Sequence, residues 1–333
     1  MTERRRTPRA RVLGTGRALP DQVVTNADLE ARVDTSDEWI QTRTGIRERR
    51  IAPPELHTSD LCDRAARQAL DAAGIGPGDL DLILVATVTP DMGFPSTACL
   101  LQDRLGTRGQ MAFDLSAGCT GFLYGLAVAE QFIRSRLVRH ALVVGAEVLS
   151  RILDWDDRAT CVLFGDGAGA AVLGPTEDPD EGILASRMAA DGSYWHLLHL
   201  PGGGSRHPPS HESVDAGLHF VKMQGNEVFK VAVRTLHQVA EDVLEAAGCT
   251  GDDLDWFVPH QANRRIIDAV RLRLHVPPEK VYLNVDRYGN TSAASVPIAL
   301  DEMVRSGKLR RGHLVLLDAF GAGFTYGAAL IRW

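Results

Sequence analysis

Cysteine is scarce in this sequence, and the spacing of its cysteines excludes the usual ways of linking them. The chain of 333 residues has five cysteines, an odd number, and none stands in a Cys-x-x-Cys pair. This pattern argues against a disulfide framework and against a zinc site, so no metal is expected. A reducing cytoplasm is the compartment that fits best. The five are Cys62, Cys99, Cys119, Cys161 and Cys249.

Long apolar runs and an excess of positive charge are also absent. No apolar run approaches the length that spans a bilayer, so no membrane association is predicted. Residues 1–12 are rich in arginine but lack a following apolar stretch, which predicts a frayed tail and not a signal peptide. The formal net charge is −7. Because phosphate binding needs a basic surface, nucleic acid is not an expected partner.

The composition that remains is typical of a globular protein, with 44% hydrophobic and 24% charged residues. The sequence also contains an internal repeat. The segment that begins at Leu70 reappears in related form at Leu244, and Phe164–Gly167 resembles Phe320–Gly323. Two copies of one α/β unit are the simplest interpretation.

The boundary between the two copies is expected in the polar linker near residues 175–182, which divides the chain into halves 1–178 and 179–333. Within the first copy, Ser59–Ala73 has apolar residues at helical spacing, which predicts a helix. The continuous apolar run Leu82–Val88 predicts a strand that is buried on both faces.

Two glycine-rich segments superficially suggest a dinucleotide site. Residues 14–20 reach a proline instead of opening a helix, and residues 165–169 precede an apolar strand. Neither segment has the Gly-x-Gly-x-x-Gly spacing followed by a helix that binds a pyrophosphate. We therefore predict that these glycines allow close packing, and that no nicotinamide cofactor binds.

One cysteine has the setting of a nucleophile. Cys119 lies within Asp114–Phe122, among residues that are too small to bury it, and it precedes the helix-forming residues 123–129. Backbone N–H groups and the positive end of a helix dipole favour thiolate over thiol. We therefore expect an accessible cysteine whose pKa is lowered toward neutrality.

Two later segments supply partners for this cysteine. Val258–Ile266 ends an apolar strand on His260, and Arg287–Ser295 places Asn290 before a run of small residues. Cys, His and Asn together suggest covalent catalysis through sulfur. The same order occurs in papain-like proteases, whose His lies roughly 130–150 residues beyond the nucleophile, so spacing alone does not separate the two interpretations. The cysteine here lacks the neighbours that such proteases have, which argues against a protease.

The chain resembles the β-ketoacyl-acyl-carrier-protein synthase III family, the condensing enzymes that start bacterial fatty acid synthesis. Matching motifs follow the family's order along nearly the whole sequence. The resemblance implies a thiolase-like fold, a five-layer αβαβα sandwich built from two duplicated α/β halves, with the active site between them. The motifs are Asn26–Leu29, Thr35–Ile40, Thr42–Arg47, Asp114–Phe122, Phe164–Ala171, Gly225–Lys230, Pro259–Asn263, Gly289–Ser295 and Phe320–Thr325.

The resemblance also implies a reaction and its catalytic residues. Cys119 would accept an acyl group from acyl-CoA, and loss of CO2 from malonyl-acyl-carrier protein would create an enolate that attacks the acyl-cysteine. His260 and Asn290 match the donors that stabilise negative charge on the thioester oxygen. The backbone N–H groups of Cys119 and Ala322 would hold the second oxyanion, although many relatives have glycine at the latter position. CoA is then a substrate, and no cofactor is expected.

Other matched positions concern CoA and the acyl group. Trp39 and Arg158 would sandwich the adenine, with Arg43 near a phosphate, because a purine stacks on indole and guanidinium. Two further matches, Asn226 and Asn263, would line the pantetheine tunnel.

The resemblance further implies protein partners. Phe94 matches a position that enters the partner subunit's acyl pocket, which implies a homodimer, and Phe320 would border the cysteine. A patch of basic residues would attract the acidic carrier protein through complementary charge. These residues are Arg265, Lys230, Arg264, Arg271 and Arg273.

Several alternatives stay open from the sequence. A priming ketosynthase of a polyketide or other specialised pathway would keep the same three catalytic residues, whereas elongating ketosynthases use a second His in place of Asn290. A non-catalytic acyl-CoA-binding protein would keep Trp39 and Arg158 but lose the triad. The length and branching of the primer acyl chain are not determined. Residues 201–211, which include two histidines, are expected to form a mobile flap near the substrate mouth and not a metal site.

Overall fold

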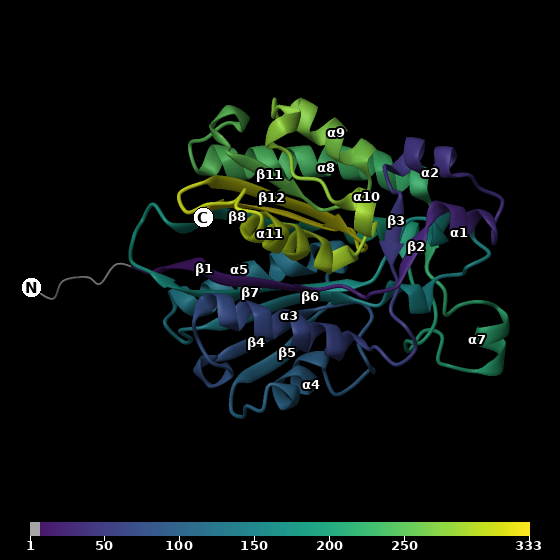
Figure 1. Cartoon of the computed structure of the whole chain (residues 1–333), viewed down its shortest axis with the longest axis horizontal. Coiled ribbons are helices and arrows are strands. Elements are labelled where there is room, and N and C mark those ends of the chain that lie inside the picture. Colours follow the sequence, from purple (N-terminus) through teal and green to yellow (C-terminus); the bar gives the residue numbers. More distant parts are fainter. Residues whose placement is uncertain (1–6) are drawn as a thin grey trace, which may run out of the picture.

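Two β-sheets form the framework of the protein, as the computed structural model shows for residues 7–333 (Figure 1). The first sheet has five strands in the order β1-β7-β6-β4-β5, and the second has four in the order β11-β12-β13-β8. The first comprises β1 (Arg9–Ala18), β4 (Leu82–Ala86), β5 (Met111–Leu115), β6 (Ala141–Glu147) and β7 (Gly167–Thr176). The second comprises β8 (Gly182–Ala190), β11 (Trp256–Pro259), β12 (Leu314–Gly321) and β13 (Thr325–Arg332). Two small sheets pair β2 (Val23–Thr25) with β3 (Glu48–Arg50), and β9 (Leu198–His199) with β10 (Lys222–Met223).

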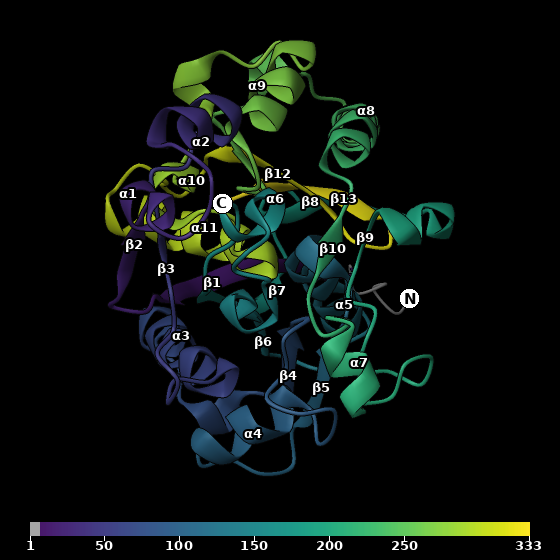
Figure 2. The same ribbon diagram turned by 90° about the vertical axis from the view of Figure 1, so that its right-hand side faces the viewer.

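Helices lie between the sheets and on both outer faces (Figures 1 and 2). α5 and α11 lie between the sheets, and their apolar side chains join those of both sheets in one core. α3 and α4 cover the outer face of the first sheet, while α8 and α9 cover that of the second. The predicted five-layer αβαβα order is thus confirmed. The bounds are α3 (Thr58–Ala73), α4 (Thr97–Arg104), α5 (Gly121–Arg134), α8 (Gly225–Ala246), α9 (Arg264–Arg273) and α11 (Ser295–Arg305).

Short helices occupy the connections at one end of the sandwich. They are α1 (Asn26–Glu30), α2 (Asp37–Thr44), α6 (Arg158–Cys161), α7 (His211–Asp215) and α10 (Val285–Tyr288). α7 lies in the loop that we expected to be a flap, and its mobility stays a prediction. Within residues 7–333, no group of His, Cys, Asp and Glu side chains could hold a metal ion. In the same range, no helix is both long and apolar enough to cross a membrane.

The strands of the two sheets come from separate parts of the chain. Those of the first lie within residues 9–176 and those of the second within residues 182–332. The linker between β7 and β8 falls at the expected place. Because both sheets share the core around α5 and α11, the division into halves 1–178 and 179–333 stays a prediction.

Local predictions were partly right. The predicted helix is α3, and Gly74 caps it in the left-handed conformation (φ 69°). The predicted strand Leu82–Val88 was two residues too long, because the chain after Ala86 turns to hydrogen-bond a buried carboxylate, that of Glu147. The frayed tail was wrong for residues 9–12, which pair with β7. Residues 1–6 lie outside the described residues.

The prediction that glycines in these segments allow close packing is correct for Gly14. Gly14 lies inside β1, where a Cβ atom would stand 2.4 Å from the backbone oxygen of Ala69 on α3. Such a contact is too short for any side chain. The glycine therefore brings the helix and the sheet together, as close packing requires.

Candidate active site

Cys119 lies where the two halves of the chain touch. It belongs to the 3₁₀ turn Gly118–Thr120 between β5 and α5. A Cβ at Gly118 would stand 2.8 Å from the backbone N of Ala322, and one at Gly321 would stand 2.4 Å from the backbone N of Cys119. These glycines therefore allow the amides of Cys119 and Ala322 to come close to each other, as the predicted oxyanion hole requires.

The expectation of an accessible thiol with a lowered pKa was wrong. Cys119 is only 8% exposed, and burial raises the pKa of its thiol to about 12. Hydrogen bonds from the side chains of Ser292 and Asn290 favour the thiolate but do not outweigh burial. Those residues belong to the second half of the chain, which covers the cysteine. At neutral pH the thiol of Cys119 is therefore protonated.

His260 follows β11 and is also buried, at 5% exposure. Burial lowers its pKa to about 3, so the imidazole is neutral throughout the physiological range. Its Nδ1 lies 2.6 Å from the hydroxyl oxygen of Ser295, at the start of α11. Its Nε2 is buried and has no hydrogen-bond partner among residues 7–333. An unpartnered ring nitrogen at a cavity wall is available to a substrate.

Asn290 is held by its own turn. Its side-chain oxygen accepts the backbone N–H of Ser292 at 2.8 Å, and its backbone N–H donates to Leu163 at 2.8 Å. With the amide oxygen engaged, the Nδ2 group is left to face the site, where Asn290 hydrogen-bonds Cys119. This turn therefore orients the side-chain amide of Asn290.

Two cavities meet at Cys119. One, of ≈610 Å³, is lined by Cys119, His260 and Asn290 together with Phe320, which is 6% exposed. Its other walls include five of the polar residues that the sequence assigned to binding, namely Arg43, Asn226, Asn263, Arg265 and Lys230. The structure thus brings the predicted catalytic residues together in one cavity with residues of the predicted pantetheine tunnel, and Phe320 lines the same cavity.

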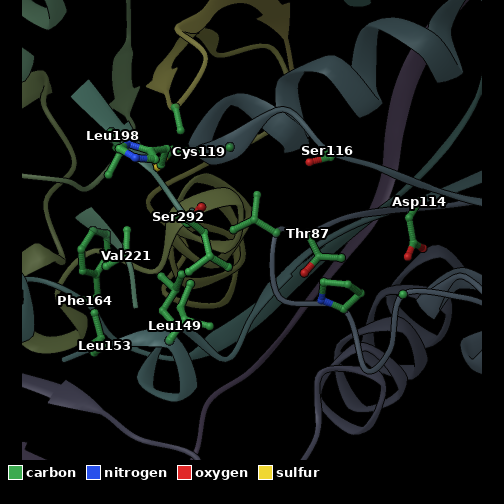
Figure 3. A pocket seen from close by; sticks show the side chains of 18 of the residues that line it. Thr87, Asp114, Ser116, Cys119, Leu149, Leu153, Phe164, Leu198, Val221 and Ser292 are labelled. Carbon is green, nitrogen blue, oxygen red and sulfur yellow. The ribbon is translucent and has the colours of Figure 1, made fainter. Parts of the chain in front are cut away.

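The second cavity, of ≈630 Å³, starts at the same cysteine and is largely apolar (Figure 3). Its walls come from both halves of the chain. The apolar lining residues include Val88, Leu149, Ile152, Leu153, Phe164, Leu198 and Val221. A thiol between two such cavities can accept the acyl end of a long thioester.

The predicted adenine site is closed by its own residues. Trp39 on α2 has the guanidinium groups of Arg43 and Arg158 over its ring, at 5.0 Å and 5.1 Å from the centroid. A purine that stacks between Trp39 and Arg158 therefore requires Arg158 to move. Asn263 caps α9 by accepting the N–H of Arg265 at 2.8 Å, and it also donates to the backbone of Arg43.

The predicted docking arginines differ in their surroundings. Arg264 and Arg271 both pair with Asp268, at 3.6 Å and 2.8 Å, and the Arg271 side chain is only 18% exposed. Arg273 is exposed near the end of α9, and Arg265 stands over the ring of Phe229. On α8, Lys230 pairs with Glu227 at 2.8 Å.

Phe94 does not contribute to the cavities of its own chain. Phe94 is 88% exposed, while Met92 and Gly93 of the same loop line the apolar cavity. The role of Phe94 in a partner subunit stays a prediction.

Sequence reasoning missed Ser292, Ser295 and Glu147 as members of the site. The two serines lie inside a motif that we had noted, so their polar side chains among small residues were a usable signal. Glu147 was marked only by a single acidic residue within the apolar run of β6 and its continuation.

Comparison with known proteins identifies the family. Residues 113–192 match the family model described as 3-Oxoacyl-[acyl-carrier-protein (ACP)] synthase III, and residues 244–333 match the model of its C-terminal part. The Beta-ketoacyl-[acyl-carrier-protein] synthase III of Caldanaerobacter subterraneus subsp. tengcongensis is 56% identical to this chain, over 97% of this chain and 98% of its own. The chain belongs to the β-ketoacyl-[acyl-carrier-protein] synthase III family.

Other synthase III proteins agree with this assignment. That of Alkalilimnicola ehrlichii is 57% identical over 97% of this chain and 99% of its own. The solved structure of the Aquifex aeolicus enzyme is 50% identical, covers 97% of this chain and 100% of its own, and has a TM-score of 0.91. The prediction of the family's thiolase-like fold is confirmed. Like other synthase III proteins, the chain is an acyl-transferring condensing enzyme of fatty acid synthesis.

Proposed function

We propose that this synthase III condenses a short-chain acyl-CoA with malonyl-acyl-carrier protein and releases CoA, CO2 and a 3-oxoacyl-carrier protein. The observation that carries the proposal is the meeting of two cavities at Cys119, one of which is also lined by His260 and Asn290. A pantetheine arm in the cavity that holds His260 and Asn290, the tunnel, would present its thioester to the thiol. The acyl chain would then enter the apolar cavity.

In the first half-reaction, the Cys119 sulfur attacks the thioester carbonyl, and CoA leaves through the tunnel. The carbonyl oxygen becomes negatively charged at that moment. The backbone N–H groups of Cys119 and Ala322, which close contacts at Gly118 and Gly321 bring together, support this oxyanion. The acyl group is left on the cysteine as a thioester.

In the second half-reaction, malonyl-carrier protein loses CO2, and negative charge develops on its thioester oxygen. Nδ2 of Asn290 and Nε2 of His260 are the donors for that oxygen. For this role Nε2 of His260 carries the imidazole proton, and Nδ1 accepts the hydroxyl proton of Ser295, whose oxygen lies 2.6 Å away. Since the imidazole is neutral, it donates a hydrogen bond without carrying a charge.

The binding residues complete the proposal. CoA would lie across Trp39, Arg43 and Arg158 with its pantetheine arm along Asn226 and Asn263, and no cofactor takes part. The carrier protein would approach the basic residues at the tunnel mouth, of which Arg265 lines the tunnel itself. The working unit would be a cytoplasmic homodimer, in which Phe94 enters the partner's acyl cavity.

A role in a specialised pathway is the second candidate. One solved structure, the priming β-ketosynthase of the R1128 polyketide pathway, is 39% identical, covers 99% of this chain and 98% of its own, and has a TM-score of 0.90. The synthase III relatives are 56% and 57% identical, so they support the fatty acid role more strongly.

Acyl labelling tests the proposal directly. Radiolabelled acetyl-CoA is expected to label the wild-type protein, while Cys119→Ser stays nearly unlabelled because its hydroxyl is a weaker nucleophile. Labelled protein should then yield a 3-oxoacyl product when malonyl-carrier protein is added. Equal labelling of both proteins would refute the role of Cys119.

A further inference from the structure

Glu147, the last residue of β6, is a fully buried carboxyl group next to the active site. Its oxygens accept hydrogen bonds from the hydroxyls of Thr87 (3.2 Å) and Thr89 (2.6 Å) and from the backbone N–H groups of Val88 and Thr89 (both 3.1 Å). The fifth donor is the hydroxyl of Ser292, 3.1 Å from Oε1. All of these partners are neutral, so no cation neutralises the carboxylate through them.

Ser292 connects this carboxyl group to the nucleophile. Its hydroxyl hydrogen-bonds both Glu147 and the thiol of Cys119, and Figure 3 shows its side chain beside Cys119 at the cavity wall. The backbone of Ser292 is in the left-handed region (φ 50°), which is unfavourable for serine. Such strain is common where a side chain must be held in one functional position.

A serine hydroxyl carries one proton and can give it to only one neighbour at a time. When Glu147 is ionised, Ser292 donates to the carboxylate, and the Cys119 S–H can donate to the serine oxygen. When Glu147 is protonated, it donates to the serine oxygen, and Ser292 donates to a Cys119 thiolate. The change between these two arrangements moves one proton from Cys119 to Glu147 without changing the total charge.

The acidities of the three buried groups fit this direction. Burial raises the pKa of Glu147 from its ordinary value to about 7, in spite of its hydrogen bonds, whereas His260 has a pKa of about 3. At neutral pH the carboxylate is therefore the better proton acceptor beside the thiol. The titratable groups that interact with Glu147 are the thiols of Cys119 and of Cys62 on α3, and burial raises the pKa of Cys62 as well.

We propose that Glu147 takes the proton of the Cys119 thiol through the hydroxyl of Ser292 and holds it until condensation releases the cysteine. This inference rests on the proposed acyl transfer. During that step the Cys119 sulfur bonds to the acyl carbon, the bond from that carbon to the CoA sulfur breaks, and the CoA thiolate leaves and is protonated by bulk solvent, which supplies the one proton that the overall reaction consumes. During condensation the enolate carbon bonds to the acyl carbon, the cysteine leaves as thiolate, and Glu147 returns the proton through Ser292.

Alkylation of Cys119 by iodoacetamide tests the proton path without using CoA. The wild-type rate is expected to rise with pH through about 7 and then level off, because the thiolate is formed by internal transfer to Glu147. Glu147→Gln keeps the shape of the side chain but cannot accept the proton. Its rate at pH 7 should fall by about 10²-fold, the lower end of general-base effects, and should keep rising at higher pH.

Two further variants separate the proton path from folding. Ser292→Gly removes the hydroxyl and places glycine at a left-handed backbone position, so the variant should fold at least as well as wild type. Its alkylation rate should no longer level off above about pH 7. Glu130→Gln removes another largely buried glutamate, further along α5, and should keep the wild-type profile. If the alkylation rates of both Glu147→Gln and Ser292→Gly depend on pH as the wild-type rate does, the inference is overturned. If Glu147→Gln does not fold, Ser292→Gly decides alone.

Acetyl labelling of the same proteins separates this inference from the proposed function. A wild-type protein with the expected alkylation profile but no acetyl label would contradict the proposed function and still support the proton path. Normal acetyl labelling of wild type, with unchanged alkylation profiles in both variants, would overturn the proton path alone.

Discussion

Cys119, His260 and Glu147 are titratable side chains in one small site, and burial shifts the pKa of each toward the value that favours its neutral form. Near neutral pH, Cys119 and His260 therefore carry no charge at rest. The two oxyanions of the proposed reaction form only when the substrate is present, beside donors that are already in place. The proposed mechanism therefore relies on orientation and hydrogen bonding.

At the same scale, the two donors can be separated from the nucleophile. His260→Ala and Asn290→Ala are expected to accept acetyl from acetyl-CoA, because neither residue is the proposed acyl carrier. Both should decarboxylate malonyl-carrier protein about 10²–10³-fold more slowly, since each loses one donor to the enolate oxygen. Release of radiolabelled CO2 measures this step, and acetyl labelling serves as the control. Wild-type CO2 release in either variant would contradict the donor role.

Glu147 should also make stability depend on pH. Its pKa is raised from 4.5 to about 7, so between these values the folded protein holds a proton that the unfolded chain has released. The stability that this pKa shift contributes to the folded state is therefore fully present below pH 4.5 and is lost as pH rises through about 7. Relative to Glu147→Gln, wild type should lose about 3 kcal/mol across this window, which urea unfolding at several pH values can measure. A constant difference between the two proteins would contradict the raised pKa.

At the scale of elements, α9 combines a structural role with the docking role that we propose. Its first turn is capped by Asn263, and Asp268 engages Arg264 and Arg271 along its length. These two arginines are thus partly neutralised. Arg265, at the tunnel wall, is the more suitable contact for an acidic carrier protein.

Arg265→Glu is therefore expected to weaken condensation with malonyl-carrier protein while sparing acetyl transfer from CoA. Rising salt should mimic the substitution in wild type, since exposed charges are screened beyond roughly 8–10 Å at 0.1–0.15 M. Arg108→Glu, in the exposed turn after α4, makes the same charge change elsewhere and should have no effect. Steady-state kinetics with each substrate varied in turn measures the difference. Equal loss of both half-reactions in Arg265→Glu would indicate a structural role instead.

At the scale of the whole molecule, the apolar cavity opens toward an exposed apolar region. Its lining includes Met92 and Leu200, which are 47% and 40% exposed. Phe94 lies in the same loop as Met92. Large apolar residues gathered at a surface commonly mark a contact with another protein. A second copy of the chain at this surface would close the cavity, so the dimer would influence which primer fits.

Two measurements check this expectation. Sedimentation should show a dimer, and Phe94→Ala should raise the rate with octanoyl-CoA relative to acetyl-CoA, because the ring no longer shortens the partner's cavity. Each additional methylene that the cavity accommodates contributes about 1–3 kcal/mol to the preference for octanoyl-CoA over acetyl-CoA. A monomer in sedimentation, or an unchanged octanoyl-to-acetyl ratio, would contradict the proposed role of Phe94.

Much of this protein was predictable from contiguous residues. The helix-mouth position of Cys119, the strand that ends before His260 and the turn that holds Asn290 are encoded by glycines and small residues next to each of them. The repeat was visible in the sequence, whereas the layer order came from the family resemblance. These features depend on local backbone geometry, which short motifs specify.

The acidity of the site depended on the tertiary structure. Cys119 became buried because residues of the second half cover it, and this burial outweighs the local helix effect that the sequence displays. The hydrogen bond between Glu147 and Ser292 joins residues 145 positions apart, so no local pattern marks it. The sequence by itself therefore pointed to Cys119, His260 and Asn290. Packing of the two halves brought Glu147 to the site and decided the protonation of the buried groups, because desolvation depends on all the atoms around a group and not on its neighbours along the chain.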